Sequence, residues 1–337
     1  MNLFKKMFIT DWAVIIYVIF ITIWTFIGRN VVCAEGFLVI GRKVLCEAGE
    51  NVVDVISTFH LLMVQYIGIL LFIFLIVMLN NYIKNPFVRF IRFWYPITLL
   101  GFFFDAATQI DRVLFTEYLD PIFQYWDYLI FGYQPVVEWG LKWNSFVIQE
   151  FFHFNYFAYY LMIFGVPLYV YLHKGKAEFV RVLFNVLFVF FTCYVVFVFL
   201  PVAGGRIMEN YYLSGVYYKG YTSYVASVRE LTETYRHGLF THIMVYIYRS
   251  STHFGGAFPS SHVAVSLTIA LLSFRYFKLL AWVLVLMTFF LAISTVFCHY
   301  HYFVDAVAGV LYGIVMFGLS ELVYALIGVK NVKYIDD

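Results

Sequence analysis

The chain has 337 residues, of which 63% are hydrophobic, 23% aromatic and only 12% charged. This composition excludes an ordinary soluble globular protein and is typical of an integral membrane protein. The net charge is only +2, and the basic residues fall in short clusters beside apolar runs, so we expect no nucleic-acid partner.

Eight apolar segments are each close to the roughly 17 to 25 residues that cross a bilayer. They lie at residues 12–27, 59–80, 93–108, 155–172, 180–200, 261–275, 278–298 and 302–326. The first resembles a signal peptide in length, but it lacks a small-x-small cleavage site and ends at Arg29, so we interpret it as a retained helix. We therefore predict an all-α integral membrane protein with about eight transmembrane helices and both termini on one side.

The basic residues occur on alternate connections between these segments, as the positive-inside rule requires of cytoplasmic connections. They are Lys5, Lys6, Lys84, Arg89, Arg92, Lys174, Lys176, Arg181, Arg275, Lys278, Lys330 and Lys333. This pattern predicts that the N- and C-termini are cytoplasmic. The loops 28–58, 109–154 and 201–260 and the turn near residue 299 then lie on the external face, either periplasmic or lumenal.

No internal repeat or low-complexity linker divides the chain. We predict a two-helix N-terminal extension at residues 1–85, followed by a six-helix membrane domain at residues 86–330. The four cysteines, Cys33, Cys46, Cys193 and Cys298, form no CxxC pair, so a zinc or redox motif is not supported. Cys33 and Cys46 share one loop, where they are either bridged or free thiols.

A polar, glycine-rich turn from Gly255 to His262 leads directly into the apolar run 263–272. A helix entered through Pro259 has a preset φ in its first turn, and Ser260 or Ser261 is placed to cap it. The free backbone N–H groups of such a helix start form an anion site, and a first-turn histidine adds a titratable donor beside a bound phosphate or carboxylate. The alternative is a capped helix start with an incidental histidine.

His301 and Asp305 stand four residues apart where the last apolar segment begins. On a helix this spacing places both on one face, so the carboxylate can accept a hydrogen bond from one imidazole nitrogen and leave the other as a base or nucleophile. The segments 261–275 and 278–298 are joined by a short turn and must be antiparallel neighbours. We therefore expect His262 and His301 to converge at one membrane depth.

A third polar element, Pro201 to Arg206, follows the segment 180–200 on the same predicted face. Arg206 keeps its proton, and its planar guanidinium matches phosphate oxygens. The glycines before it allow the backbone to approach a ligand closely. The three elements together offer a cation, a helix N-terminus and two histidines, a set that suits phosphoryl transfer through a covalent phosphohistidine.

These elements resemble the signature motifs of the type 2 phosphatidic acid phosphatase superfamily. Pro259 to His262 resembles the second motif, His301 to Gly309 the third, and Pro201 to Arg206 a reduced first motif. The resemblance is specific across residues 196–325, and it implies a six-helix catalytic core. It also implies that His301 is the nucleophile, Asp305 its orienting partner and His262 the general acid. The phosphate-binding residues that it implies are Arg206, Ser261, Ser260 and Gly256.

The chain departs from the phosphatase motifs where two cations are expected. Phe199 stands in place of a first-motif lysine, Ile207 in place of a proline, and Thr295 in place of a third-motif arginine. A dianionic phosphomonoester needs more positive charge than a diester, so the pattern is closer to the inositol phosphorylceramide synthase branch. That branch moves a phosphorylated head group between membrane lipids in sphingolipid metabolism, and its reaction needs neither a metal nor a nucleotide cofactor. Other basic residues could replace the missing cations, for example Arg112, Lys219 or Arg249.

Two alternatives stay open. With water as acceptor, the protein would be a lipid phosphate phosphatase acting on phosphatidic acid or on a polyprenyl or sphingoid phosphate. Without turnover, it would be a head-group transporter or a scaffold. A metal site is disfavoured because a helix places His299 and His301 on different faces. No oligomeric state is predicted.

The remaining polar residues of the external loops are interpreted as ordinary interfacial groups. His237, His242 and His253 are interpreted as interfacial hydrogen-bonding side chains. The acidic residues are interpreted as solvated helix ends with local ion pairs, the alternative being selection of a head group. They are Asp105, Asp111, Glu117, Asp120, Asp127 and Glu150, with Arg112 and His153 beside them.

Overall fold

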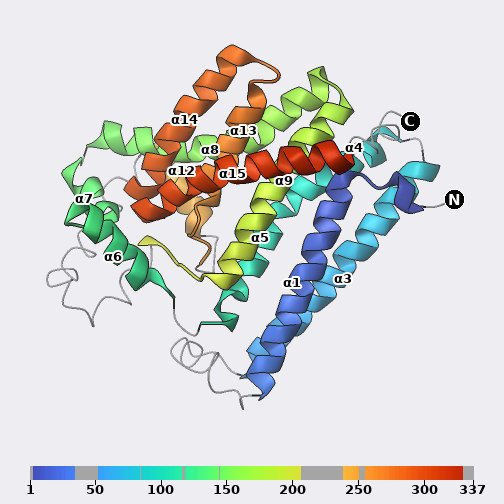
Figure 1. Ribbon diagram of the computed structural model, residues 1–337, viewed down its shortest axis with the longest axis horizontal. Helices are drawn as coiled ribbons and strands as arrows, with labels where there is room; N and C mark the ends of the chain where they lie inside the picture. Colours follow the sequence, from blue (N-terminus) through green and yellow to red (C-terminus); the bar gives the residue numbers. More distant parts are fainter. Residues whose placement is uncertain are drawn as a thin grey trace. The chain divides into compact units, whose positions relative to one another are not determined.

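The computed structural model describes residues 3–34, 52–83, 85–115, 118–143, 145–205, 238–249 and 255–328. Every regular element in these residues is a helix, which confirms the predicted all-α class (Figure 1). The chain divides into two compact units built from discontinuous segments. Unit 1 is Met1–Glu117, Val170–Phe199 and Gly318–Asp337, and unit 2 is Tyr118–Tyr169 and Leu200–Phe317. The predicted domain boundary after residue 85 stays a prediction.

Seven helical segments of the described chain are long and apolar enough to cross a membrane, as expected of a multi-pass membrane protein. They are Ile9–Gly28, Phe59–Tyr82, Pro86–Val113, Phe146–His173, Lys176–Phe199, Lys278–Phe297 and Phe303–Ile327. The remaining predicted span, residues 261–275, forms the shorter helix α13 (Ser261–Ser273). At about 1.5 Å per residue it is roughly 20 Å long, against a hydrocarbon core about 30 Å thick. The count of eight spans and the six-helix core therefore stay predictions.

Unit 1 is built around α1, which packs against α3 and α9. Tyr17 of α1 stacks on Phe191 of α9, with ring centroids 4.4 Å apart. The elements of this unit are η1 (Leu3–Lys6), α1 (Ile9–Ala34), α3 (Val52–Tyr82), α4 (Pro86–Thr98), α5 (Leu100–Gln109), η2 (Asp111–Val113) and α9 (Lys176–Phe199). The side chain of Cys33 and all of Cys46 lie outside the described residues.

A buried ion pair joins α1 to α4. The guanidinium of Arg92 donates to both carboxylate oxygens of Asp11, with Nη1 2.6 Å from Oδ1. The Tyr95 hydroxyl and the Phe8 backbone N–H also donate to this carboxylate, at 2.5 and 2.6 Å. Since both charged side chains are fully buried, each depends on the other for neutralisation.

We expect Asp11→Leu to lower the free energy of unfolding by about 3–5 kcal/mol, because it leaves the Arg92 guanidinium buried without its counter-charge. The double variant Asp11→Leu/Arg92→Met removes both charges and should recover most of the loss. Thermal unfolding in detergent measures both variants. A single variant as stable as the double variant would show that this charge balance does not stabilise unit 1.

Unit 2 carries all the candidate motifs. Its helices α13 and α14 form the predicted antiparallel pair, joined by residues 274–277 (Figure 1). The elements of unit 2 are α6 (Asp120–Phe131), α7 (Pro135–Lys142), α8 (Phe146–His173), α12 (Leu239–Arg249), α13, α14 (Lys278–Phe297) and α15 (Phe303–Ile327). The ends of α8 and α15 extend into unit 1.

Two glycines of α15 bring it against α13. A Cβ on Gly309 would lie 2.7 Å from the Ser260 carbonyl oxygen and 3.1 Å from the Val263 Cβ. One turn later, a Cβ on Gly313 would lie 2.9 Å from the Ala264 carbonyl oxygen. Small residues four apart permit this close helix contact inside a membrane. The start of α13 is thereby held next to the start of α15.

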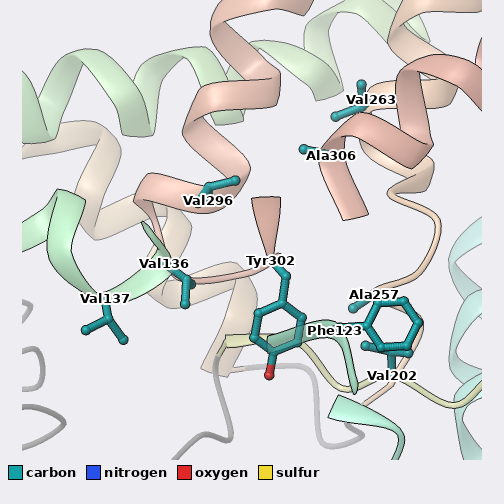
Figure 2. Close-up of a cluster of buried hydrophobic side chains, with 9 residues drawn as sticks. All are labelled: Phe123, Val136, Val137, Val202, Ala257, Val263, Val296, Tyr302 and Ala306. Carbon is teal, nitrogen blue, oxygen red and sulfur yellow. The ribbon is translucent and has the colours of Figure 1, made fainter. Parts of the chain in front are cut away.

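A cluster of buried apolar side chains includes residues of these two helix starts (Figure 2). Its members come from α6, α7, α13, α14, α15 and three connecting segments, and are Phe123, Val136, Val137, Val202, Ala257, Val263, Val296, Tyr302 and Ala306. Such a close-packed cluster fixes the relative positions of the segments that contribute to it. The polar groups described next are attached to these same segments.

Candidate functional site

Backbone hydrogen bonds join the three predicted motif segments to one another. The Ala257 N–H of the second segment donates to the Val202 carbonyl of the first, at 2.9 Å. The Ser260 N–H donates to the Asp305 carbonyl of the third, at 3.1 Å. The segments therefore meet in unit 2, as the sequence predicts.

His301 lies in the turn between α14 and α15, and not on a helix as its spacing from Asp305 predicts. Its backbone N–H donates to the Thr295 carbonyl at 3.0 Å, and its side chain is 3% exposed. The Nδ1 atom is 3.6 Å from Oδ2 of Asp305. The Nε2 atom is 3.3 Å from the Ser260 hydroxyl oxygen. One imidazole nitrogen thus faces a carboxylate and the other faces the start of α13.

Asp305 is held by the start of its own helix. It occupies the third position of α15, and its Oδ2 accepts the backbone N–H of Tyr302 at 2.9 Å, which is the backward bond of a capping box. The side chain is fully buried. The proximity of His301 and Asp305 therefore arises from helix capping, because the histidine precedes the helix that carries the carboxylate.

His262 lies in the first turn of α13, and its ring centroid is 5.6 Å from that of His301. Two tyrosines of α8 flank it. The Tyr156 hydroxyl oxygen is 3.3 Å from Nε2 of His262, and the Tyr159 ring centroid is 4.5 Å from the His262 ring. Neither tyrosine belongs to one of the three sequence motifs. The convergence of the two histidines follows from the α13–α14 pair.

At the start of α13, the position of Pro259 differs from the prediction. Ser260 is the N-cap residue, so Pro259 precedes the cap instead of entering the first turn. The Ser260 side chain makes no capping bond, because its hydroxyl faces His301. Ser261 is the first helical residue and is 3% exposed. Gly256 lies upstream with φ of 73°, a conformation that glycine adopts without strain.

Arg206 lies outside the described residues, so its predicted place beside the histidines stays a prediction. The glycine segment before it is described. Gly204 has φ of 84°, and a Cβ on it would overlap the Tyr300 carbonyl oxygen. The first segment therefore runs directly against the turn that carries His301.

Two carboxylates of α6 hold the first and third segments, and the sequence interpretation of these residues was wrong. Asp120 accepts the backbone N–H groups of Ala203 and Gly204, each at 2.9 Å, and the Tyr302 hydroxyl at 2.8 Å. Asp127 accepts the N–H groups of Phe303 and Val304 at 2.8 and 3.0 Å. Both side chains are at most 1% exposed, so neither is a solvated helix end. Their seven-residue spacing, two helical turns, was the available signal.

Burial raises the pKa of both α6 carboxyl groups, to about 6 for Asp120 and about 7 for Asp127. The backbone N–H donors lower each pKa, but they do not offset the loss of water. We name these two side chains the α6 carboxylate pair. They act on the backbone of the motif segments, and neither is in hydrogen-bond contact with either histidine.

A family model described as PAP2 superfamily matches residues 127–319, which is more than half of the chain. The chain belongs to the PAP2 superfamily. Membership indicates an enzyme with phosphatase or phosphotransferase activity. Searches of curated proteins and of solved structures found no match. The match includes the second and third motif segments, and it begins at Asp127.

The two positions where this PAP2 protein lacks an expected cation serve packing and backbone geometry instead. Thr295 is fully buried, and its hydroxyl donates to the Ala292 carbonyl at 2.8 Å. Phe199 ends α9 and packs on Trp24 within unit 1, with ring centroids 4.6 Å apart. Within the described part of the chain, no three His, Cys, Asp or Glu side chains group as metal ligands.

We expect Asp120→Asn to lower turnover of the PAP2 protein by about 10- to 100-fold. The amide retains the shape of the carboxylate, but its NH₂ group must face one of the donors from Ala203, Gly204 or Tyr302, which costs about 1–3 kcal/mol. Glu138→Gln on the exposed face of α7 is the matched control and should leave turnover unchanged. Equal activity of both variants would contradict a positioning role for the α6 carboxylate pair.

His299 is predicted to make the stability of the protein pH-dependent. Its Nδ1 atom pairs with the Val136 carbonyl, and burial lowers its pKa from 6.5 to about 4. The folded state therefore binds fewer protons than the unfolded state between these values. The contribution of the neutral ring, up to about 3 kcal/mol, is present above pH 6.5 and is lost as the pH falls through 4.

Thermal unfolding of the wild type and of His299→Asn at pH 7 and at pH 4.5 measures this effect. Asparagine is chosen because it tolerates the positive φ of 65° at this position. The wild type should lose more stability on acidification than the variant. Equal losses of stability in the wild type and in His299→Asn would show that another group causes the pH dependence.

Proposed function

We propose that this PAP2 protein is a membrane-embedded lipid phosphotransferase that works through a phosphohistidine on His301. The observation that carries the proposal is the geometry of one buried imidazole. Nδ1 of His301 lies 3.6 Å from the Asp305 carboxylate, while its ring lies 5.6 Å from that of His262. An oriented nucleophile beside a second histidine supports covalent catalysis with general acid–base assistance.

In the first step, Nε2 of His301 attacks the phosphorus of a lipid phosphodiester. The bond between phosphorus and the lipid oxygen breaks, and His262 donates a proton to that oxygen. The head group stays on phosphorus as a phosphohistidine ester. Asp305 accepts a hydrogen bond from the Nδ1–H group of His301 and stabilises the positive charge that forms on the ring. The Ser260 hydroxyl, now 3.3 Å from Nε2, can then donate to a phosphate oxygen.

In the second step, the hydroxyl of an acceptor lipid loses its proton to His262 and attacks phosphorus. The phosphorus–nitrogen bond breaks and its electron pair returns to His301, so both histidines regain their starting states. The proposed phosphate site is the set of N–H groups at the start of α13, with Ser260, Ser261 and Gly256 as phosphate-binding residues. Arg206 is the proposed cation at this site, on the basis of its motif.

We propose an inositol phosphate head group as the transferred unit and a ceramide-type alcohol as the acceptor. Phe199 and Thr295 leave the site with fewer cations than the phosphatase motifs provide, which favours a singly charged diester over a dianionic monoester. The site is proposed to open at the external or lumenal face, with both termini cytoplasmic, as the distribution of basic residues supports. No cofactor takes part in either step.

The test compares two substrates of the purified protein in detergent. One reaction contains labelled phosphatidylinositol and ceramide, and the other contains labelled phosphatidic acid. The proposal predicts transfer of the label to ceramide in the first and little inorganic phosphate from the second. Phosphate release without transfer would instead identify a lipid phosphate phosphatase, and no turnover of either would favour a transporter or scaffold.

A further inference from the structure

Tyr156 contacts the proposed general acid from a helix that carries none of the three motifs. It lies in the middle of α8, and its side chain is fully buried. Its hydroxyl oxygen is 3.3 Å from Nε2 of His262, and its ring centroid is 5.1 Å from the His262 ring. A buried tyrosine hydroxyl usually has a hydrogen-bond partner, and here the partner is a histidine of the site.

The packing around Tyr156 holds its ring in place. Its ring centroid is 4.9 Å from that of Tyr300, the residue before His301. Tyr159, one turn further along α8, packs its ring against the same imidazole of His262 at 4.5 Å. Aromatic side chains of α8 therefore contact both His262 of the second motif and the turn that leads into the third motif. A hydroxyl fixed in this way can define the orientation of the imidazole that it contacts.

The two nitrogens of His262 have different surroundings. Nε2 is in contact with the Tyr156 hydroxyl. Nδ1 is buried and has no hydrogen-bond partner among the described residues. A buried imidazole nitrogen without a partner is costly unless a ligand or another group satisfies it. In the reaction proposed above, the group that exchanges a proton with His262 is a lipid oxygen.

We propose that Tyr156 is a positioning residue that holds Nε2 of His262, so that Nδ1 is the nitrogen that exchanges protons with the two lipid oxygens. The inference rests on the proposed function of His262 as general acid and base. Nε2–H of His262 donates to the Tyr156 oxygen throughout the cycle. Nδ1–H passes its proton to the departing lipid oxygen, and the Nδ1 lone pair then takes the proton of the acceptor hydroxyl. One proton is given and one is recovered, so the ring ends the cycle as it began.

The leaving group of the substrate provides a sharp test. Tyr156→Phe keeps the ring but removes the hydroxyl, so it should lower kcat for phosphatidylinositol by about 10- to 100-fold, within the range of general acid catalysis. With the nitrophenyl ester of inositol phosphate, whose phenolate departs without a proton, the loss in formation of the phosphohistidine should be under about threefold. Tyr169→Phe makes the same change elsewhere on α8, at a ring that packs on Phe277, and should alter neither rate.

A double-variant cycle separates this inference from the proposed function. Tyr156→Phe should have no further effect in a His262→Ala background, because the hydroxyl acts only through that ring. If His262→Ala lowers turnover and Tyr156→Phe does not, the inference fails while the proposed function stands. If His262→Ala leaves turnover unchanged, the role proposed for His262 fails, and the inference fails with it.

A spectroscopic measurement gives a result that does not depend on turnover. The ¹⁵N chemical shifts of the His262 imidazole, assigned by comparison with His262→Ala, report which nitrogen carries the proton. The neutral wild-type ring should be protonated on Nε2, and Tyr156→Phe should shift the ring toward a mixture of both tautomers. A wild-type ring protonated on Nδ1, or a tautomer unaffected by Tyr156→Phe, would overturn the inference.

Discussion

His301→Gln is expected to lower kcat by about 10⁴-fold or more, because it removes the atom that would carry the phosphoryl group. Glutamine preserves a polar side chain next to Ser260 but has no nucleophilic nitrogen. The backbone N–H of residue 301 donates the hydrogen bond to the Thr295 carbonyl, so the substitution does not remove this bond. Transfer from labelled phosphatidylinositol measures the loss, and thermal unfolding verifies that the variant is folded.

The matched control for this variant is His242→Gln. His242 lies on α12 with an exposed side chain. Its ring has the same chemistry as that of His301, and no carboxylate pairs with it among the described residues. Its replacement should leave kcat within about twofold of the wild type, as is usual for an exposed position. A folded His301→Gln variant that retains more than about a tenth of the wild-type kcat would contradict a nucleophilic role, since that loss is far smaller than the loss of a nucleophile.

Asp305→Asn is expected to give the second-largest effect, a fall in kcat of about 10²- to 10⁴-fold. The amide oxygen can replace Oδ2 and keep the Tyr302 backbone bond, so the start of α15 should persist. The negative charge facing Nδ1 of His301 is lost, and the positive ring of the phosphohistidine is no longer stabilised. If the amide is rotated, its NH₂ group faces Nδ1 and forces the ring proton onto the nucleophilic Nε2.

Asp305→Glu tests whether charge alone is sufficient. The longer side chain keeps the charge but cannot occupy the buried position between Tyr302 N–H and His301 without displacement. We expect Asp305→Glu to recover less than about a tenth of the wild-type kcat, because proximity effects demand correct geometry. Full activity of Asp305→Asn would show that Asp305 serves the capping of α15 alone.

The sequence predicts the arrangement of the site where a local motif and the connection between two helices both constrain it. The turn between α13 and α14 is short, so the start of one helix and the end of the other must lie side by side, and this predicts the meeting of His262 with the turn that holds His301. The match over residues 127–319 supports the family. The predicted reason for the His301–Asp305 contact was wrong in detail, because the helix begins only at Phe303.

The groups that position the site could not be found in the same way. Asp120 and Asp127 belong to none of the three motifs. Their seven-residue spacing places them on one face of α6, but it does not show that this face is buried. Tyr156 is one of many aromatic residues in α8, and exposed and buried rings occur side by side along this helix. Its contact with His262 spans 106 residues and depends on the packing of unit 2.

The most direct measurement is a search for the covalent intermediate. The purified protein is mixed with excess phosphatidylinositol without an acceptor, quenched in alkali, which preserves phosphohistidine, and digested for mass spectrometry. The account predicts an acid-labile, alkali-stable inositol phosphate adduct on His301 that is absent from His301→Gln and is discharged by ceramide in the wild type. Turnover with no adduct on His301, or with an adduct on another residue, would contradict it.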